Sequence, residues 1–578
     1  MSRKVSSLLF GITVVVLLAG LPLAAQTRTV PESGLAGHPE KFSRDLRESR
    51  PADGASLIDV IVQYKHVPTE AHHQRVVERG GRVKARLHFI KTAAYSVPAS
   101  ALADLANDPE VAYVSPDRKL NGLLDNTAAA VNAAAAWQSH YDGKGIGVAV
   151  IDSGMSDTSD LPRNTRVVYT QDFTGEGIDD LYGHGQHVAG IIGGNGSKSK
   201  GSGYTRTFMG IAPKANLINL HVLNHNGQGT DSSVIAAIDK AIQLKSQYNI
   251  RVINLSLGRP VFESYTQDPL CQAVEAAWKA GIVVVVAAGN SGRDNSFGTG
   301  GYGTIAAPGN DPYVITVGAM KTMGTPQRSD DLIASYSSKG PTMIDHVVKP
   351  DIVAPGNRVA SVEPPASSIA STYPQVIVPL AYYMTNPGGK NSRSWDYMVF
   401  SGTSMATPVV SGAVADLLEA QPLLTPDQVK VRLMETAYKA FPSTSSVVDP
   451  ATGTVYVDQY DIFTIGAGYL DIQAALARSD AAPGVALSPT VSFDSATGNV
   501  DIVTAANSTW AQNSVWGVKS VWGSAVFLTG TNSVWGSNSV WGSSTTQGFN
   551  AVWGQKSVWG STSNDATETT SILIGGEN

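Results

Sequence analysis

Residues 400–408, FSGTSMATP, are the part of the chain on which the interpretation of the rest depends. Ser404 follows Gly402 and Thr403 where a loop leads into the apolar run VVSGAVADLL, so the pattern predicts a serine in the first turn of a helix. Free backbone N–H groups and the positive end of the helix dipole converge there, and both stabilise an oxyanion. A serine hydroxyl becomes a useful nucleophile when an adjacent imidazole accepts its proton and a carboxylate orients that imidazole.

Two upstream segments supply candidates for the carboxylate and the imidazole. Residues 148–154, VAVIDSG, form an apolar run ending at Asp152, which is how a buried parallel strand delivers a carboxylate at its carboxyl end. Residues 183–190, GHGQHVAG, place His184 between two glycines at the start of a helical segment. Taken singly, the Asp152 motif is typical of a turn, the His184 motif of a loop and the Ser404 motif of a helix cap, and none of them alone predicts a catalytic residue. Together they predict an active site of Asp152, His184 and Ser404.

These motifs resemble those of the subtilisin-like serine proteases (subtilases), whose catalytic residues follow the same order along the chain. The resemblance implies a serine endopeptidase that hydrolyses peptide bonds through an acyl-enzyme intermediate. It further implies that Asn290, at the end of the run VVVVAAGN, holds the oxyanion together with the backbone N–H of Ser404. The residues expected to bind substrate are Ser256, Leu257, Gly258, Ala287, Ala288 and Gly289, with Gly227 and Gly229 beside a more distal pocket.

The chain departs from the family pattern at two places. Gln186 stands where the family usually has threonine, which predicts a small change beside His184. The Gly/Ser/Lys-rich loop after His184 is unlike the family's calcium-binding loop, and Asp160 alone is a poor site for an ion that takes six to eight oxygens. We therefore expect no required cofactor and assign no metal ligands, with calcium only weakly supported.

Composition excludes several other classes of protein. The 578 residues include 42 Lys and Arg against 48 Asp and Glu, and the resulting net charge of −6 argues against a nucleic-acid partner. Cys271 is the only cysteine, so a disulfide framework is excluded. It falls on the apolar side of a predicted helix, which favours a buried structural thiol over a reactive one.

The first 25 residues have the pattern of a secretory signal. Arg3 and Lys4 precede an apolar run over residues 8–18, and small residues follow at Ala24 and Ala25. A membrane anchor is the alternative, but the run is short for a span of about 20 residues. We expect a secreted protein, extracellular or in the cell envelope, with no membrane segment in its mature form. Residues 26–55 are polar and are interpreted as a linker.

Residues 56–120 alternate strand and helix patterns in the order βαββαβ. This order resembles the ferredoxin-like α+β propeptide of subtilisin-like proteases, an intramolecular inhibitor that would pack on the substrate-binding surface. Cleavage is predicted within residues 117–128, an irregular polar segment between two patterned regions. A permanently attached accessory domain is the alternative.

Residues 127–478 are predicted to form the catalytic domain, an α/β fold with a doubly wound, mainly parallel sheet. Amphipathic helices are expected over residues 231–247 and 268–280, and a capping box predicts another from Thr425 to about residue 437. An insertion over residues 356–401 is either a rim or lid over the cleft or a surface elaboration without contact to substrate.

The C-terminal region, residues 481–578, carries the repeated tetrapeptide [SA]VWG. Its glycines predict short β-strands and turns that pack on one another, while a module that binds a surface or glycan and a flexible or removable tail remain alternatives. A second hypothesis for the whole chain follows, namely a surface-binding or adhesion protein that keeps a protease fold as a scaffold and binds through its tryptophan-rich tail. The repeat tryptophans fall in three pairs: Trp516 and Trp522, Trp535 and Trp541, Trp553 and Trp559.

Overall fold

The structure is a computed structural model that divides into two compact units, Met1–Leu120 and Asn121–Asn578. The predicted signal segment and the [SA]VWG repeats lie outside the residues that it describes. The described residues are 38–43, 46, 56–87, 91–116, 123–296, 298–389, 392–449, 452–479, 484–494, 499–503 and 565–577.

The first unit is built on a four-stranded antiparallel sheet in the order β2-β3-β1-β4. Its buried core includes Val60 and Val62 of β1 and Leu102 and Leu105 of α3. The expected βαββαβ order is therefore present. Its elements are β1 (Leu57–Tyr64), α2 (Glu70–Glu78), β2 (Arg82–Leu87), β3 (Thr92–Pro98), α3 (Leu102–Asn107) and β4 (Val111–Pro116).

Part of the predicted linker belongs to this unit. Phe42 forms an isolated bridge with Val114 of β4, and the side chains of Phe42 and Leu46 are both buried in the core. The interpretation of residues 26–55 as a linker is therefore wrong for these two positions. Phe42 and Leu46 are isolated apolar residues in a polar segment. Because they do not belong to a periodic apolar pattern, their burial could not be predicted from the sequence.

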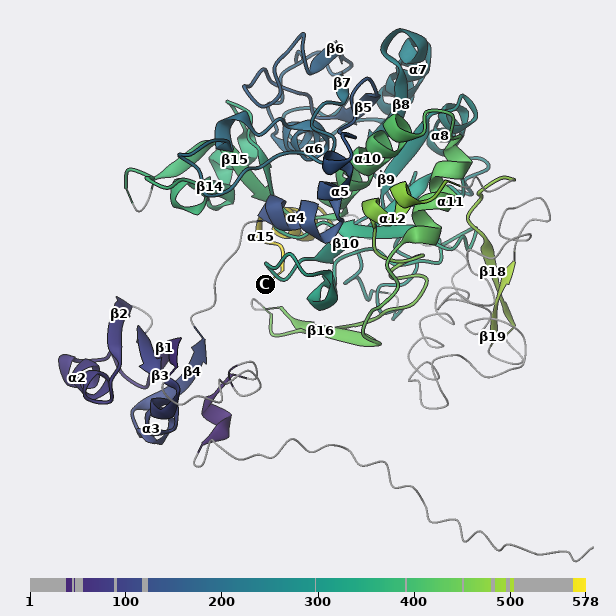
Figure 1. Ribbon diagram of the computed structural model, residues 1–578. Coiled ribbons are helices and arrows are strands. Elements are labelled where there is room, and N and C mark those ends of the chain that lie inside the picture. Colours follow the sequence, from purple (N-terminus) through teal and green to yellow (C-terminus); the bar gives the residue numbers. More distant parts are fainter. Residues whose placement is uncertain are drawn as a thin grey trace, which may run out of the picture. The chain divides into compact units, whose positions relative to one another are not determined.

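The second unit is built on a mainly parallel eight-stranded sheet (Figure 1). Seven strands follow the order β11-β10-β9-β8-β5-β7-β6, and β12 also pairs with β10. Only the β10–β11 pair is antiparallel. The expected α/β class is confirmed. The strands are β5 (Gly147–Asp152), β6 (Val167–Asp172), β7 (Asn216–His221), β8 (Ile250–Leu255), β9 (Val283–Ala287), β10 (Ile315–Lys321), β11 (Leu332–Ile333) and β12 (Ile352–Pro355).

The three helices expected from the sequence are confirmed to within about a residue at each end. Thr230, Asp268 and Thr425 cap them, each side chain accepting a hydrogen bond from a backbone N–H of the first turn. Cys271 lies in the second helix and is buried, as predicted for a structural thiol, and burial raises its pKa. These helices are α7 (Asp231–Tyr248), α8 (Pro269–Lys279) and α11 (Pro426–Thr436).

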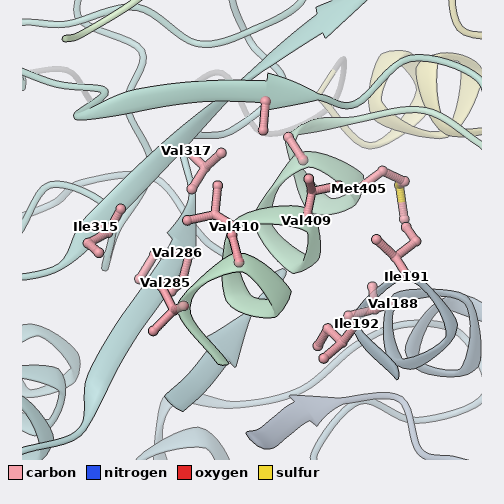
Figure 2. Packing of buried hydrophobic residues seen from close by; sticks show 14 of the residues in the cluster. Val188, Ile191, Ile192, Val285, Val286, Ile315, Val317, Met405, Val409 and Val410 are labelled. Atoms are coloured by element: carbon pink, nitrogen blue, oxygen red, sulfur yellow. The ribbon is translucent and has the colours of Figure 1, made fainter. Parts of the chain in front are cut away.

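Helix α10 (Thr403–Ala420) is buried along most of its length and packs against the sheet and against α6 (His184–Gly193). Figure 2 shows Val410 of α10 facing Val317 of the sheet, with Met405 directed toward Ile191 of α6. Apolar side chains on almost every side of α10 explain this complete burial. The helix that begins beside Ser404 is therefore fixed by the core.

The second unit extends beyond the boundary expected near residue 478. Thr490 forms an isolated bridge with Val347, and Ser488 N donates to Pro312 O. Residues 486–491, which include the start of β18 (Thr490–Asp494), thus pack on the rest of this unit. The terminal α15 (Asp565–Gly575) also contacts it. The predicted boundary is too early because it was placed where the composition changes, near residue 481. The chain continues to pack on this unit beyond that point.

The insertion over residues 356–401 forms a small antiparallel sheet in the order β13-β15-β14. Tyr383 and Tyr397 of this insertion pack around Phe208, and Thr205 N donates to Tyr383 O. The insertion and the loop after His184 thus share one aromatic cluster. The strands are β13 (Val359–Val362), β14 (Ile377–Pro379) and β15 (Arg393–Phe400).

Within the described ranges, no helix has both the length and the apolar character needed to cross a bilayer.

A buried charge cluster joins residue 488 to the sheet. The Asp351 carboxylate lies 2.7 Å from Lys349 Nζ and 3.3 Å from Lys430 Nζ, and it accepts a hydrogen bond of 2.5 Å from Ser488 Oγ. Burial raises the pKa of Asp351, but the two ammonium groups outweigh this effect and leave the pKa below its ordinary value. The charges compensate one another at a site that solvent does not reach.

We expect Asp351→Asn to lower the free energy of unfolding by about 3–5 kcal/mol, because it leaves buried ammonium groups uncompensated. The pKa of Asp351 is depressed, so its contribution is present above the unfolded value of about 3.9 and is lost as pH falls through the folded value. Urea unfolding of both proteins in a Ser404→Ala background, at pH 7 and at pH 3, measures the difference. Asp239→Asn, on the exposed face of α7, is the matched control; equal losses in the two variants would contradict the expectation.

Candidate active site

Asp152 and His184 form a buried pair. Asp152 is the last residue of β5 and His184 the first of α6, and His184 Nδ1 lies 2.8 Å from Asp152 Oδ1. Ser153 N donates to the same carboxylate oxygen at 2.8 Å. Because the carboxylate accepts from Nδ1, the neutral imidazole carries its proton there and keeps Nε2 free as a base.

The carboxylate sets the basicity of the imidazole. Burial lowers the pKa of His184, but the charge of Asp152 and its hydrogen bond together outweigh burial and raise the pKa above its ordinary value. Neighbouring His187 is also buried, and burial together with His184 lowers its pKa to about 3. His187 Nε2 donates to Val359 O at 2.9 Å and its ring packs on Phe400. Of the two histidines, only His184 is suited to exchange a proton near neutral pH.

Asp180 positions both members of this pair, and the sequence analysis did not identify it. Its carboxylate accepts from Gly183 N and Gln186 N, both at 2.7 Å, and so caps the helix that begins at His184. It also accepts from Ser153 Oγ at 2.9 Å, next to Asp152. A helix-capping aspartate four residues before His184 is a signal that the sequence did contain.

Gln186 connects the same two elements from the other side. Its Oε1 accepts from Ser156 N at 2.8 Å, and its Nε2 donates to Thr158 Oγ1 at 3.2 Å. The side chain is fully buried. The departure from threonine therefore links α6 to the loop after Asp152 rather than changing the environment of the His184 ring.

Ser404 lies in the first turn of α10, after Gly402. Its Oγ donates to Ser256 O at 3.1 Å, and Ser256 Oγ donates to Ser404 O at 2.8 Å. No hydrogen bond between Ser404 and His184 is present among the described residues. Ser404 is partly exposed, so its hydroxyl is accessible, and hydrogen bonds of this kind often form only when substrate is bound.

Asn290 lies beside the start of the same helix. Its Oδ1 accepts from Thr403 N at 2.9 Å and from Thr403 Oγ1 at 3.1 Å, which fixes the orientation of the amide. A side chain at Gly402 would place a Cβ 3.2 Å from Asn290 Nδ2, at a φ of +144° that other residues rarely adopt. Glycine at position 402 therefore leaves room for the Asn290 amide beside Ser404.

A cavity of about 550 Å³ contains these residues. Seven of the eight residues expected to bind substrate line it: Ser256, Leu257, Gly258, Ala287, Gly289, Gly227 and Gly229, together with His184, Asn290 and Ser404. Ala288 does not line it, because this residue is fully buried and its N–H donates to Val317 O of the sheet. The cavity walls also include Tyr182, Phe262 and Leu573, which no sequence motif indicated.

The insertion over residues 356–401 lies beside the approach to His184. Ser368 N donates to Leu181 O and Ile369 N to Tyr182 O, so the insertion holds the segment that leads into α6. Among the residues of the cavity wall, none belongs to this insertion. The described part of the insertion supports one wall through Tyr182 and does not contact the space beside Ser404.

Asp160 is engaged by donors from the protein itself. Its carboxylate accepts from Ser197 Oγ at 2.6 Å, from Lys198 N at 2.9 Å and from Tyr397 Oη at 2.5 Å. Calcium binds oxygen atoms that have free lone pairs. The Asp160 carboxylate already accepts three hydrogen bonds, and the groups around it are donors. Within the described ranges, no group of three or more His, Cys, Asp or Glu side chains has an arrangement that could hold a metal ion.

Comparison with known proteins places this site in a family. The model of the subtilase family matches residues 143–468, more than half of the chain. The chain belongs to the subtilase family. Serine protease AprX of Bacillus subtilis (strain 168) is 36% identical to this subtilase over 364 residues, which cover 61% of the chain and 75% of AprX.

Two further relatives match a larger share of the chain. Subtilisin E of Bacillus subtilis (strain 168) is 31% identical over 437 residues, covering 75% of this subtilase and 92% of the relative. The extracellular serine proteinase of Thermus sp. (strain Rt41A) is 30% identical over 466 residues, covering 74% of this subtilase and 92% of the relative. This subtilase is thus a subtilisin-like serine endopeptidase, a hydrolase whose substrates are proteins or peptides.

Proposed function

We propose that Asp152, His184 and Ser404 are the catalytic residues of this subtilase. The observation that carries the proposal is the buried 2.8 Å contact between Asp152 and His184, because His184 lines the same cavity as Ser404. Ser404 Oγ turns from Ser256 O toward His184 when substrate binds, gives its proton to Nε2 and attacks the peptide carbonyl. Asp152 stabilises the imidazolium, which then protonates the leaving amine.

The oxyanion would be held by two donors, Asn290 Nδ2 and the backbone N–H of Ser404. The contacts of Thr403 with Asn290 Oδ1 support this role, because they leave Nδ2 available to the cavity. The N–H of Ser404 lies in a first helical turn, where backbone donors have no partner within the helix. Both donors are thus available where negative charge develops.

The protein would be secreted as a precursor and would process itself. The signal-like first 25 residues and the similarity to the extracellular serine proteinase of Thermus sp. (strain Rt41A) support export. The separate four-stranded unit before residue 120 supports an inhibitory propeptide, which is removed by cleavage within residues 117–128. The alternative, an adhesion protein with an inactive protease scaffold, rests on the [SA]VWG repeats alone.

The intact mass of the secreted product tests the precursor hypothesis. The unmodified chain should lose its signal and every residue up to a point within 117–128, because Ser404 cleaves that segment. Ser404→Ala should lose the signal alone. If both proteins emerge with the same mass above that of the catalytic unit, self-processing is refuted. If Ser404→Ala is trimmed as well, another protease performs the cleavage.

The pH dependence of activity tests the roles of Asp152 and His184. Neutral His184 is the base, and its pKa is raised, so kcat/KM of the unmodified enzyme should fall on the acid side with a midpoint above about 6.5. Asp152→Asn removes the charge that raises this pKa. The midpoint should then move to lower pH, and kcat should fall by about 10⁴. An unchanged midpoint in a folded variant would contradict this assignment.

Substitutions of Asn290 separate oxyanion binding from the positioning of Thr403. Asn290→Ala should lower kcat by about 10²–10³, the effect of losing one oxyanion donor. Asn290→Asp keeps an acceptor for Thr403 but removes the amide donor. Its kcat should therefore be at least as low as that of Asn290→Ala. Steady-state kinetics on one peptide substrate measures both variants. Normal turnover in Asn290→Asp would show that Asn290 serves only to position Thr403.

A further inference from the structure

The last described residues of the chain lie against the loop that carries the nucleophile. Ser401, three residues before Ser404, donates its N–H to Leu573 O at 3.0 Å. Gly576 has a φ of +61°, and a Cβ at this position would lie 2.3 Å from Ser401 Oγ. Ile572 and Leu573 are buried. The end of the chain is therefore closely packed beside Ser404.

Glu577 fills a pocket with two positive side chains. Its Oε1 lies 2.6 Å from Arg293 Nη2 and accepts from Ser335 N at 2.9 Å. Its Oε2 lies 3.1 Å from Lys321 Nζ, an ion pair outside hydrogen-bond geometry. The side chains of Glu577 and Lys321 are 1% and 5% exposed. Two cations and a backbone donor, all directed at one carboxylate, form a site suited to an acidic side chain.

The pocket also binds the main chain of this residue. Asn357 Nδ2 donates to Glu577 O at 2.8 Å, and Asn357 Oδ1 accepts from Glu577 N at 2.8 Å. Asn357 follows Gly356, whose carbonyl accepts from Gly402 N at 2.8 Å. The site that holds Glu577 is thus continuous with the backbone that leads into Ser404.

Leu573 connects this docked segment with the catalytic cavity. It lines the cavity that contains Ser404, His184 and Asn290, and it is 9% exposed. It is held on the side of Ser401, whereas Ser256 and Gly289 form other parts of the wall. A polypeptide that passes Ser404 toward Ser401 meets Leu573 and finds the N–H of Ser401 already occupied.

We propose that residues 570–577 are a latch, an intramolecular ligand that covers the Ser401 side of the cleft and is displaced by long substrates. Glu577 holds the latch in the pocket of Arg293 and Lys321, and Leu573 narrows the cleft. Substrate residues on the Ser401 side of the scissile bond therefore compete with the latch. Substrates that end at the scissile bond do not.

Kinetics of the full processed enzyme, with residue 578 confirmed by mass, tests the latch. Two substrates share one acyl sequence, and one ends in a chromogenic leaving group while the other continues for several residues. In Glu577→Gln the KM of the extended substrate should fall by about tenfold, because the competent open state becomes more populated. Its kcat should stay constant, and kcat/KM for the short substrate should change less than about twofold.

A peptide in trans provides the complementary measurement. The synthetic peptide TSILIGGEN, residues 570–578, should raise the KM of the extended substrate when it is added to Glu577→Gln. The same peptide with glutamine in place of Glu577 should not. Glu275→Gln, which breaks the 2.5 Å pair with Lys279 on α8, is the matched control and should behave as the unmodified enzyme.

Two results would overturn the latch. If Glu577→Gln lowers kcat equally on both substrates, the segment supports the Ser404 loop and does not compete with substrate. If Glu577→Gln changes the kinetics of neither substrate and the added peptide has no effect, the docked segment does not obstruct the cleft. Cleavage of the short substrate by Glu577→Gln also shows that the catalytic residues still work, so failure of the latch is distinct from failure of the proposed mechanism.

Discussion

The packing of α10 against the parallel sheet is the constraint on which the site depends. This helix is buried along most of its length against β8, β9 and β10 and against α6. Its first turn therefore has no freedom to move away from the carboxyl ends of the strands. Asp152, Ser256 and Asn290 lie at or just beyond those ends, as residues of a doubly wound fold do at a site. Positions far apart in the chain converge because the core fixes one helix.

Much of this arrangement could be predicted from local patterns. The run VVVVA forms the fully buried strand β9, and the capping box at Thr425 begins a helix as expected. The candidate residues Asp152, His184, Asn290 and Ser404 follow from short motifs because each lies near the end of a strand or at the start of a helix. A motif of this kind fixes both the residue and its local backbone.

Other features depend on contacts that no local pattern contains. Leu573 and Glu577 contact residues more than 150 positions earlier, so nothing in their own neighbourhood indicates a place beside Ser404. The hydrogen bond between Tyr397 and Asp160 is similar, since the hydroxyl belongs to the insertion and the carboxylate to a loop far from it in the sequence. Asp180 is a different case, because an aspartate four residues before His184 is a local signal for a helix cap. Its role could therefore be predicted from the sequence.

The cluster of Asp351, Lys349, Lys430 and Ser488 bears on how this gene could be rearranged. Ser488 lies twenty residues beyond the end of the family match at residue 468, yet it completes the hydrogen bonding of a carboxylate in the core. A recombination joint placed at residue 468 or 480 would separate these partners and leave buried charges without a neutral donor. A joint that keeps this cluster intact must therefore fall after residue 488.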